Sequence, residues 1–156
     1  DNVIGKISSK FESTWRRLES KGKMESGTIV IDDYAHHPTE VKATLSSLKD
    51  MVGENKLVVV FQPHLYSRTK IFYKEFAAAL NIANKVVLLP IYAAREKEDK
   101  KINSNMIAEL IDPKKISLVD SLKLGVEKLK SLDLKENDIV VTMGAGDVYT
   151  IGEKLI

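Results

Sequence analysis

The stretch Ile31-Asp-Asp-Tyr-Ala-His-His-Pro-Thr-Glu40 contains the end of one predicted strand and the start of one predicted helix. An apolar run from Thr28 leads into it. Pro38 suits the first turn of a helix, where no N–H is needed, and Glu40 suits the positive end of the helix dipole. The polar residues between them therefore lie on a strand-to-helix loop, which is where open α/β sheets bind ligands.

The rest of the chain repeats this alternation of strand and helix. Strands are predicted at residues 15–21, 28–32, 56–61, 85–90, 116–119 and 138–143, and helices at about 38–50, 68–81, 104–111, 121–132 and 147–155. The first two strands are separated by few residues, so they pair antiparallel as a hairpin. The remaining pattern predicts an α/β fold: a Rossmann-like, doubly wound sheet of about six strands, five parallel and one an antiparallel edge strand, with helices on both faces.

Composition excludes several classes of protein. The 156 residues are 44% hydrophobic and 29% charged, typical of one globular domain. A net charge of +2 gives no reason to expect nucleic acid or a membrane as partner. The absence of cysteine excludes disulfides and is compatible with a cytoplasmic protein. The chain begins with Asp1 rather than Met, so we expect it to be part of a longer chain. Residues 1–14 have weak patterning and are read as the tail of a preceding domain or linker, with a short helix as the alternative, and residues 15–156 as one domain.

The three histidines, His36, His37 and His64, each follow the C-terminal end of a predicted strand. Parallel strands bring such loops to one edge of the sheet, so we expect the three rings to lie near each other. We expect His36 to face a site and His37 to cap or buttress the following helix. Three histidines could also suggest a metal centre, but acidic neighbours already offer partners, and no metal site is predicted.

The usual phosphate-binding loops are missing from this sequence. No Gly-x-x-x-x-Gly-Lys-Ser/Thr motif occurs, and Gly144-Ala-Gly146 is only a fragment of a dinucleotide-binding loop. We therefore do not expect the chain to wrap a triphosphate and its magnesium unaided.

Five short motifs together resemble the C-terminal domain of the Mur ligases. They are Arg16-Arg17, Asp33-Tyr-Ala-His-His-Pro-Thr-Glu40, Phe61-Gln-Pro-His64 with Ser67-Arg-Thr69, Tyr92-Ala-Ala-Arg-Glu96 and Gly144-Ala-Gly-Asp147. The resemblance runs from about Phe11 to the end of the chain, in the order of the family. One departure is Leu65, where some members carry a second arginine.

The resemblance implies a part in a larger ATP-dependent carboxylate–amine ligase. Within the family, the motifs are most similar to those of the bacterial, cytoplasmic ligase that adds L-alanine to UDP-N-acetylmuramate through an acyl phosphate, in peptidoglycan precursor synthesis. ATP and Mg²⁺ would be bound mainly by a central domain outside this chain. This domain would work with the parent's own N-terminal and central domains, closing over ATP and supplying part of the amino-acid site. Alone, it should be inactive.

The resemblance and the residue chemistry together suggest roles for single residues. The predicted catalytic residues are His36 and His64; the predicted amino-acid site is His64, Tyr66, Arg68 and Asp147; the predicted ATP contacts are Arg16, Arg17, Asp33 and Tyr34. An arginine at a helix N-terminus, with free backbone donors beside it, is a natural carboxylate site. On an alternating strand only one of Arg16 and Arg17 can face ATP, and the resemblance favours Arg17. The group that deprotonates the amine stays open.

Three other functions are compatible with the same residues. The nearest is the related ligase that recycles a ready-made peptide onto UDP-N-acetylmuramate, which the Gln62-Pro-His64 motif disfavours. A non-catalytic nucleotide or amino-acid binding module and a metal-dependent hydrolase are the others.

Overall fold

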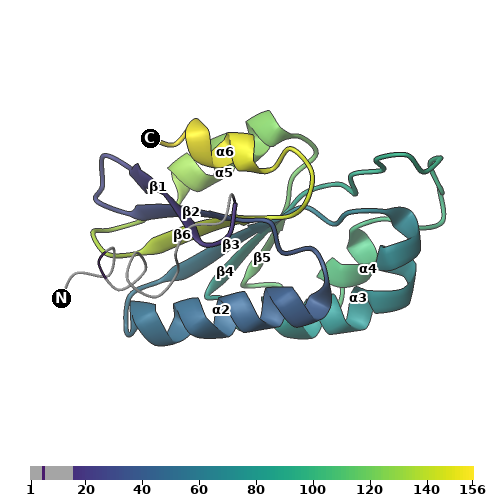
Figure 1. Cartoon of the computed structure of the whole chain (residues 1–156), viewed down its shortest axis with the longest axis horizontal. Coiled ribbons are helices and arrows are strands. Elements are labelled where there is room, and N and C mark those ends of the chain that lie inside the picture. The colour runs from purple at the N-terminus through teal and green to yellow at the C-terminus, as the bar shows by residue number, and fades with distance from the viewer. Residues whose placement is uncertain (1–4, 6–15) are drawn as a thin grey trace.

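The computed structural model describes Gly5 and residues 16–156 and contains one six-stranded sheet in the order β1-β2-β6-β3-β4-β5 (Figure 1). The strands are β1 (Glu19–Lys23), β2 (Ile29–Asp33), β3 (Leu57–Phe61), β4 (Lys85–Leu88), β5 (Ile116–Leu118) and β6 (Ile139–Met143). β1 pairs antiparallel with β2 at one edge, and the other pairings are parallel. The predicted fold class is confirmed. The expected linker at residues 1–14 lies outside the described residues, apart from Gly5.

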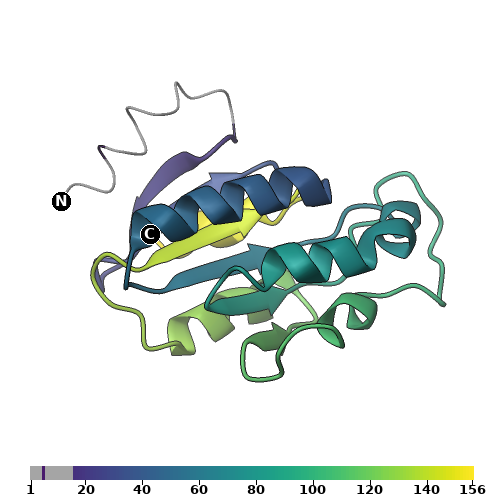
Figure 2. The same cartoon turned by 90° about the horizontal axis from the view of Figure 1, so that it is seen from below.

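The helices cover both faces of the sheet. They are α2 (Pro38–Val52), α3 (Tyr66–Leu80), α4 (Asn105–Ala108), α5 (Leu122–Ser131) and α6 (Tyr149–Glu153). Figure 2 looks onto the face covered by α2, α3 and α4, while α5 and α6 lie on the opposite face in Figure 1. Alternate residues of each central strand enter two separate hydrophobic cores: Ile31 packs with α2 and α3, and Val30 packs with α5 and α6.

The first strand is shorter than predicted. The sequence pattern predicted a strand over residues 15–21, but β1 begins at Glu19, because Arg16 and Leu18 have positive φ angles of 54° and 45°. Such angles lie in the left-handed region, which no strand residue adopts. Arg16 and Arg17 therefore do not alternate along a strand, and the expectation that strand facing selects between them was wrong. Trp15 lies outside the described residues.

Removal of buried side-chain volume should destabilise the core beneath α2. Leu45 is fully buried there, whereas Leu124 on α5 is 42% exposed. We expect Leu45→Ala to lower the free energy of unfolding by about 2–5 kcal/mol through lost burial and a residual cavity. Leu124→Ala, the same chemical change at a half-exposed position, should cost less than about 1 kcal/mol. Urea denaturation of the chain measures both, and equal effects would contradict the assigned core.

Candidate functional site

The loops that follow β2, β6 and β3 meet at the C-terminal edge of the sheet. Because β6 lies between β2 and β3, the glycine loop at residues 144–147 separates the two histidine loops in sheet order. The rings of His36 and His64 nevertheless lie 6.0 Å apart, in an edge-to-face arrangement. The His37 ring instead packs against Phe72 of α3, with centroids 4.9 Å apart. All three rings were expected to lie near each other; the structure brings the His36 and His64 rings together and packs the His37 ring on Phe72.

His37 and His36 have different local roles. His37 Nδ1 accepts a hydrogen bond from the Thr39 N–H at 3.2 Å, and Glu40 Oε1 accepts one from the His37 N–H at 3.2 Å. This capping box confirms the prediction that His37 caps the helix. His36 Nδ1 lies 2.9 Å from the Tyr34 carbonyl oxygen. A carbonyl can only accept, so Nδ1 carries a proton, and in the neutral ring Nε2 is left as a hydrogen-bond acceptor.

His64 has the opposite tautomer, because its neighbour is a cation. Arg68 Nη1 lies 3.3 Å from His64 Nδ1 and also donates to the His64 carbonyl oxygen at 3.4 Å. A guanidinium can only donate, so Nδ1 accepts and Nε2 carries the proton. Burial lowers the pKa of His64, and the positive charge of Arg68 lowers it further. The edge of the sheet thus offers one ring nitrogen that accepts, on His36, and one N–H that donates, on His64.

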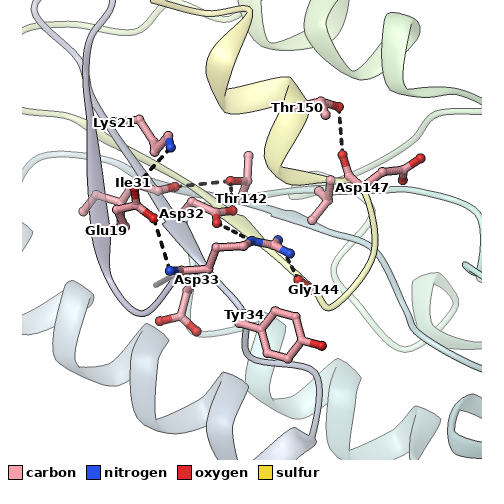
Figure 3. Close-up of polar contacts among 12 residues, drawn as sticks. Glu19, Lys21, Ile31, Asp32, Asp33, Tyr34, Thr142, Gly144, Asp147 and Thr150 are labelled. Carbon is pink, nitrogen blue, oxygen red and sulfur yellow. Dashed lines mark hydrogen bonds and ion pairs between the residues drawn. The ribbon is translucent and has the colours of Figure 1, made fainter. Parts of the chain in front are cut away.

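Arg16 is a buried connector between distant segments. Its Nε donates to Asp32 Oδ2 at 2.7 Å, and its Nη2 and Nη1 donate to the carbonyl oxygens of Gly144 and Gly146 at 2.9 and 3.2 Å. Thr142 Oγ1 donates to the second oxygen of Asp32 at 2.7 Å. Figure 3 shows Asp32, Thr142 and Gly144 gathered around this network. The guanidinium of Arg16 is therefore engaged with the protein itself.

Arg17 lies on the surface beside a cleft. Together with Asp33, Tyr34 and the first turns of α2, it lines a cleft of about 290 Å³. Asp33 accepts hydrogen bonds from the Leu18 N–H at 2.9 Å and the Ala35 N–H at 2.8 Å. Burial raises the pKa of Asp33, and these two hydrogen bonds oppose the rise. Of the two arginines, Arg17 is thus the one placed to meet a ligand in this cleft.

The start of α3 differs from the sequence-based expectation. The backbone donors beside Arg68 were expected to be free, but the Ser67 N–H donates to Glu96 Oε1 at 3.1 Å. Tyr66 lines a cavity of about 350 Å³ with Glu98 and Asp99. Burial there, followed by the nearby negative charges, raises the pKa of Tyr66.

Asp147 is the last residue of the glycine loop and lies apart from Asp32 and Gly144 in Figure 3. Its Oδ1 accepts a hydrogen bond from Gln62 Nε2 at 2.8 Å, while Gln62 Oε1 accepts one from the Val148 N–H at 3.2 Å. Both side chains line a cavity of about 240 Å³ that Tyr92 and Asp120 also border. Asp147 is therefore held in place by the loop after β3, within reach of a ligand beside Tyr92.

Sequence reasoning missed Thr142, and it named Gln62 and Glu96 only as members of motifs, without the bridging role of Gln62 or the contact of Glu96 with α3. Thr142 is a buried hydroxyl in the otherwise apolar strand β6, and that polar interruption was a usable signal. No sequence signal indicated the other two, because their partners are distant in the chain. Within residues 16–156, no group of three or more His, Asp or Glu side chains could hold a metal ion. No helix in the same range could span a membrane.

Loss of the Arg16 guanidinium should be costly, because it leaves the Asp32 carboxylate buried without its cation. The two side chains are only 5% and 1% exposed. We expect Arg16→Met to lower the free energy of unfolding by about 3–5 kcal/mol. Arg17→Met removes the same charge one residue away on the surface and should cost less than about 1 kcal/mol. Urea denaturation measures both, and similar losses would refute the assigned difference.

The charge on Arg68 should be visible in the titration of His64. We expect the His64 ring to titrate with a pKa below 6.5, and Arg68→Met to raise that pKa by removing the nearby positive charge and the hydrogen bond to Nδ1. In the wild-type chain, His64 binds a proton more tightly in the unfolded state than in the folded state. The free energy of unfolding should therefore rise with pH between the lowered folded pKa of His64 and about 6.5. Lys70→Met on the same helix is the charge-matched control. NMR titration of the ring signals measures the pKa, and a wild-type value at or above 6.5 would contradict this assignment.

Comparison with known proteins agrees with this geometry. Residues 16–146 match the family described as "Mur ligase, glutamate ligase domain". The UDP-N-acetylmuramate–L-alanine ligase of Lachnospira eligens is 47% identical over 150 residues, which cover 95% of this chain and 32% of that protein. The chain thus spans about a third of the length of the curated relatives it matches.

Two solved structures share the fold and part of the sequence. The UDP-N-acetylmuramate–alanine ligase of Thermotoga maritima has a TM-score of 0.71 and 29% identity, covering 94% of this chain and 30% of that one. A domain from Haemophilus ducreyi, assigned to a UDP-N-acetylmuramate:L-alanyl-γ-D-glutamyl-meso-diaminopimelate ligase, has a TM-score of 0.67 and 26% identity, covering 89% of this chain and 96% of that one. The strand order, the paired histidine loops and these matches lead to one conclusion: the chain belongs to the Mur ligase family, as its C-terminal, glutamate ligase domain.

Proposed function

We propose that this domain serves in an ATP-dependent ligase that adds L-alanine to UDP-N-acetylmuramate in the bacterial cytoplasm, during peptidoglycan precursor synthesis. The observation that carries the proposal is the grouping of His36, His64 and Arg68 at one edge of the sheet. The identity of 41–47% to relatives named for this reaction supports the choice of substrate. The sugar nucleotide, the phosphate-binding loop and the rest of the ligase would lie in the parent's N-terminal and central domains.

The reaction joins a carboxylate to an amine in two steps. The γ-phosphoryl group of ATP passes to the carboxylate of UDP-N-acetylmuramate, which gives ADP and an acyl phosphate. The neutral amine of L-alanine then attacks the acyl carbon, the C–O bond to phosphate breaks, and inorganic phosphate leaves as the amide forms. The ammonium proton must be lost for this attack, and most of the acceleration comes from positioning and charge stabilisation.

The amino-acid side of the site can be assigned to three residues. The guanidinium of Arg68 and the Nε2–H of His64 would bind the carboxylate of L-alanine. Both groups donate hydrogen bonds, and the guanidinium also carries the positive charge that attracts a carboxylate. The Nε2 acceptor of His36, on the adjacent ring, would hydrogen-bond the amine. Asp147 would border the pocket from the glycine loop. Tyr66, which lines the cavity beside Glu98 and Asp99, would contact the same substrate from the start of α3.

The ATP side of the site can be assigned to the cleft at the start of α2. Arg17 would meet phosphate oxygens, and Tyr34 and Asp33 would bound the nucleotide, while Arg16 holds the segment that carries Arg17. Closure of the domain would exclude water that hydrolyses the acyl phosphate. Mg²⁺ would be held mainly by the parent's central domain, together with the phosphates of ATP. The isolated chain should therefore be inactive.

Phosphate release by the longer protein that carries this domain tests the reaction. With ATP, Mg²⁺ and UDP-N-acetylmuramate present, we expect release to require L-alanine. His64→Ala and Arg68→Ala should raise the KM for L-alanine by about 10-fold to 100-fold, as expected for lost hydrogen bonds to a charged group. Lys70→Ala, on the exposed side of α3, is the matched control and should leave KM unchanged.

The same assay separates the nearest alternative. The likeness to the Haemophilus ducreyi domain keeps the peptide-joining ligase as a second candidate. Release only with L-alanyl-γ-D-glutamyl-meso-diaminopimelate would move the assignment to that enzyme. Release with neither acceptor would contradict both functions and favour a binding module.

A further inference from the structure

The connection from β4 to α4 extends away from the sheet at the end where α3 begins (Figure 1). α3 has no cap of its own: its N-cap residue, Leu65, makes no side-chain hydrogen bond and has a φ angle of 74°. Glu96, in the connection, supplies the missing side-chain cap: its Oε1 accepts a hydrogen bond from the Ser67 N–H at 3.1 Å. An anionic side chain is favoured at the positive end of a helix dipole. α3 is therefore capped by a carboxylate that lies about thirty residues further along the chain.

We propose that Glu96 is a positioning residue: it latches the turn at residues 92–96 onto the start of α3 and thereby holds Tyr92 against His64. Glu96 itself does not line the cleft or the cavity assigned to substrates. The effect on L-alanine rests on the function proposed above, whereas the latch itself is a property of this chain alone.

The turn at residues 92–96 couples the position of Glu96 to that of Tyr92. The Glu96 N–H donates to the Ala93 carbonyl oxygen at 2.9 Å, which closes a tight turn. Ala94 within it has a φ angle of 52°, a conformation that side chains other than glycine rarely adopt. Such a strained turn persists when its two ends are held in place. The Ser67–Glu96 hydrogen bond holds one end.

Tyr92 holds the other end, through pairing with the chain around His64. Its N–H donates to the Pro63 carbonyl oxygen at 2.8 Å, and its carbonyl accepts the Leu65 N–H at 2.9 Å. The Tyr92 ring stacks on the His64 ring with centroids 5.7 Å apart and planes 14° from parallel. The glycine loop abuts the same ring, since a Cβ on Gly146 would lie 2.7 Å from Tyr92 Cγ. Tyr92 is thus wedged between the glycine loop and His64.

This wedge orients the His64 ring. One face of the His64 ring is covered by Tyr92 and its Nδ1 is held by Arg68, so these two contacts fix the plane and the rotation of the ring beside His36. If the Ser67–Glu96 hydrogen bond is lost, Tyr92 is held less firmly against His64, and the His64 ring gains rotational freedom. The donor geometry needed to bind a carboxylate would then be populated only part of the time, which weakens apparent affinity in proportion.

Hydrogen exchange on the 156-residue chain tests the latch directly. The amides of Leu65 and Tyr92 report the pairing that the latch protects. We expect Glu96→Ala to speed their exchange by about 5-fold to 10-fold, as for loss of a helix cap. Glu96→Gln, whose side-chain oxygen can still accept from Ser67, should have a smaller effect. Glu98→Ala removes the same charge two residues away and is the matched control. Unchanged exchange in Glu96→Ala, or equal acceleration in Glu98→Ala, would overturn the proposal.

Kinetics of the longer ligase test the consequence for the site. We expect Glu96→Ala to raise the KM for L-alanine by about 3-fold to 10-fold with little change in kcat or in the KM for ATP, and Glu96→Gln to restore part of the loss. A fall in kcat without a change in KM would overturn the positioning role. Faster amide exchange in Glu96→Ala, in a ligase that uses no L-alanine, would uphold the latch and contradict the proposed function instead.

Discussion

The buried ion pair between Arg16 and Asp32 is the interaction on which the site edge depends. Two charges held out of water are stable only if each is fully paired, and here the guanidinium also satisfies the Gly144 and Gly146 carbonyls while the carboxylate accepts from Thr142. One side chain thereby ties the segment before β1 to the loop after β6. That tie sets where Arg17 meets the cleft, because the two residues are adjacent in the chain.

The insertion of β6 between β2 and β3 decides what the histidines can reach. It places the glycine loop between the loops that carry His36 and His64, and the lack of a Cβ at positions 144 and 146 leaves room for what packs there. A Cβ on Gly144 would lie 2.8 Å from the Gln62 carbonyl oxygen, and one on Gly146 would lie 2.5 Å from Gln62 Oε1. The glycine-rich sequence is thus explained by close packing of protein against protein.

The edge of the sheet groups donors, acceptors and a cation, and the sequence contains no Gly-x-x-x-x-Gly-Lys-Ser/Thr loop for a nucleoside triphosphate. His36 and His64 present one acceptor and one donor side by side, and Arg68 adds a cation. No described cluster of side chains could hold a metal ion. Under the proposed function, the nucleotide would be bound mainly by the parent's other domains; the chain itself spans about a third of the length of its curated relatives.

Periodicity and local chemistry in the sequence were enough to determine the strand–helix alternation, the antiparallel edge strand, the capping role of His37 and the meeting of His36 with His64. These features depend on residues close in sequence, or on the rule that parallel strands end at one edge. Only the tertiary structure decided that Arg16 turns inward, that Tyr66 lines a cavity with acidic residues, and that Glu96 caps α3. Each of those depends on left-handed backbone angles or on partners from distant segments, and the order of the strands in the sheet, which no local pattern encodes, brings such partners together.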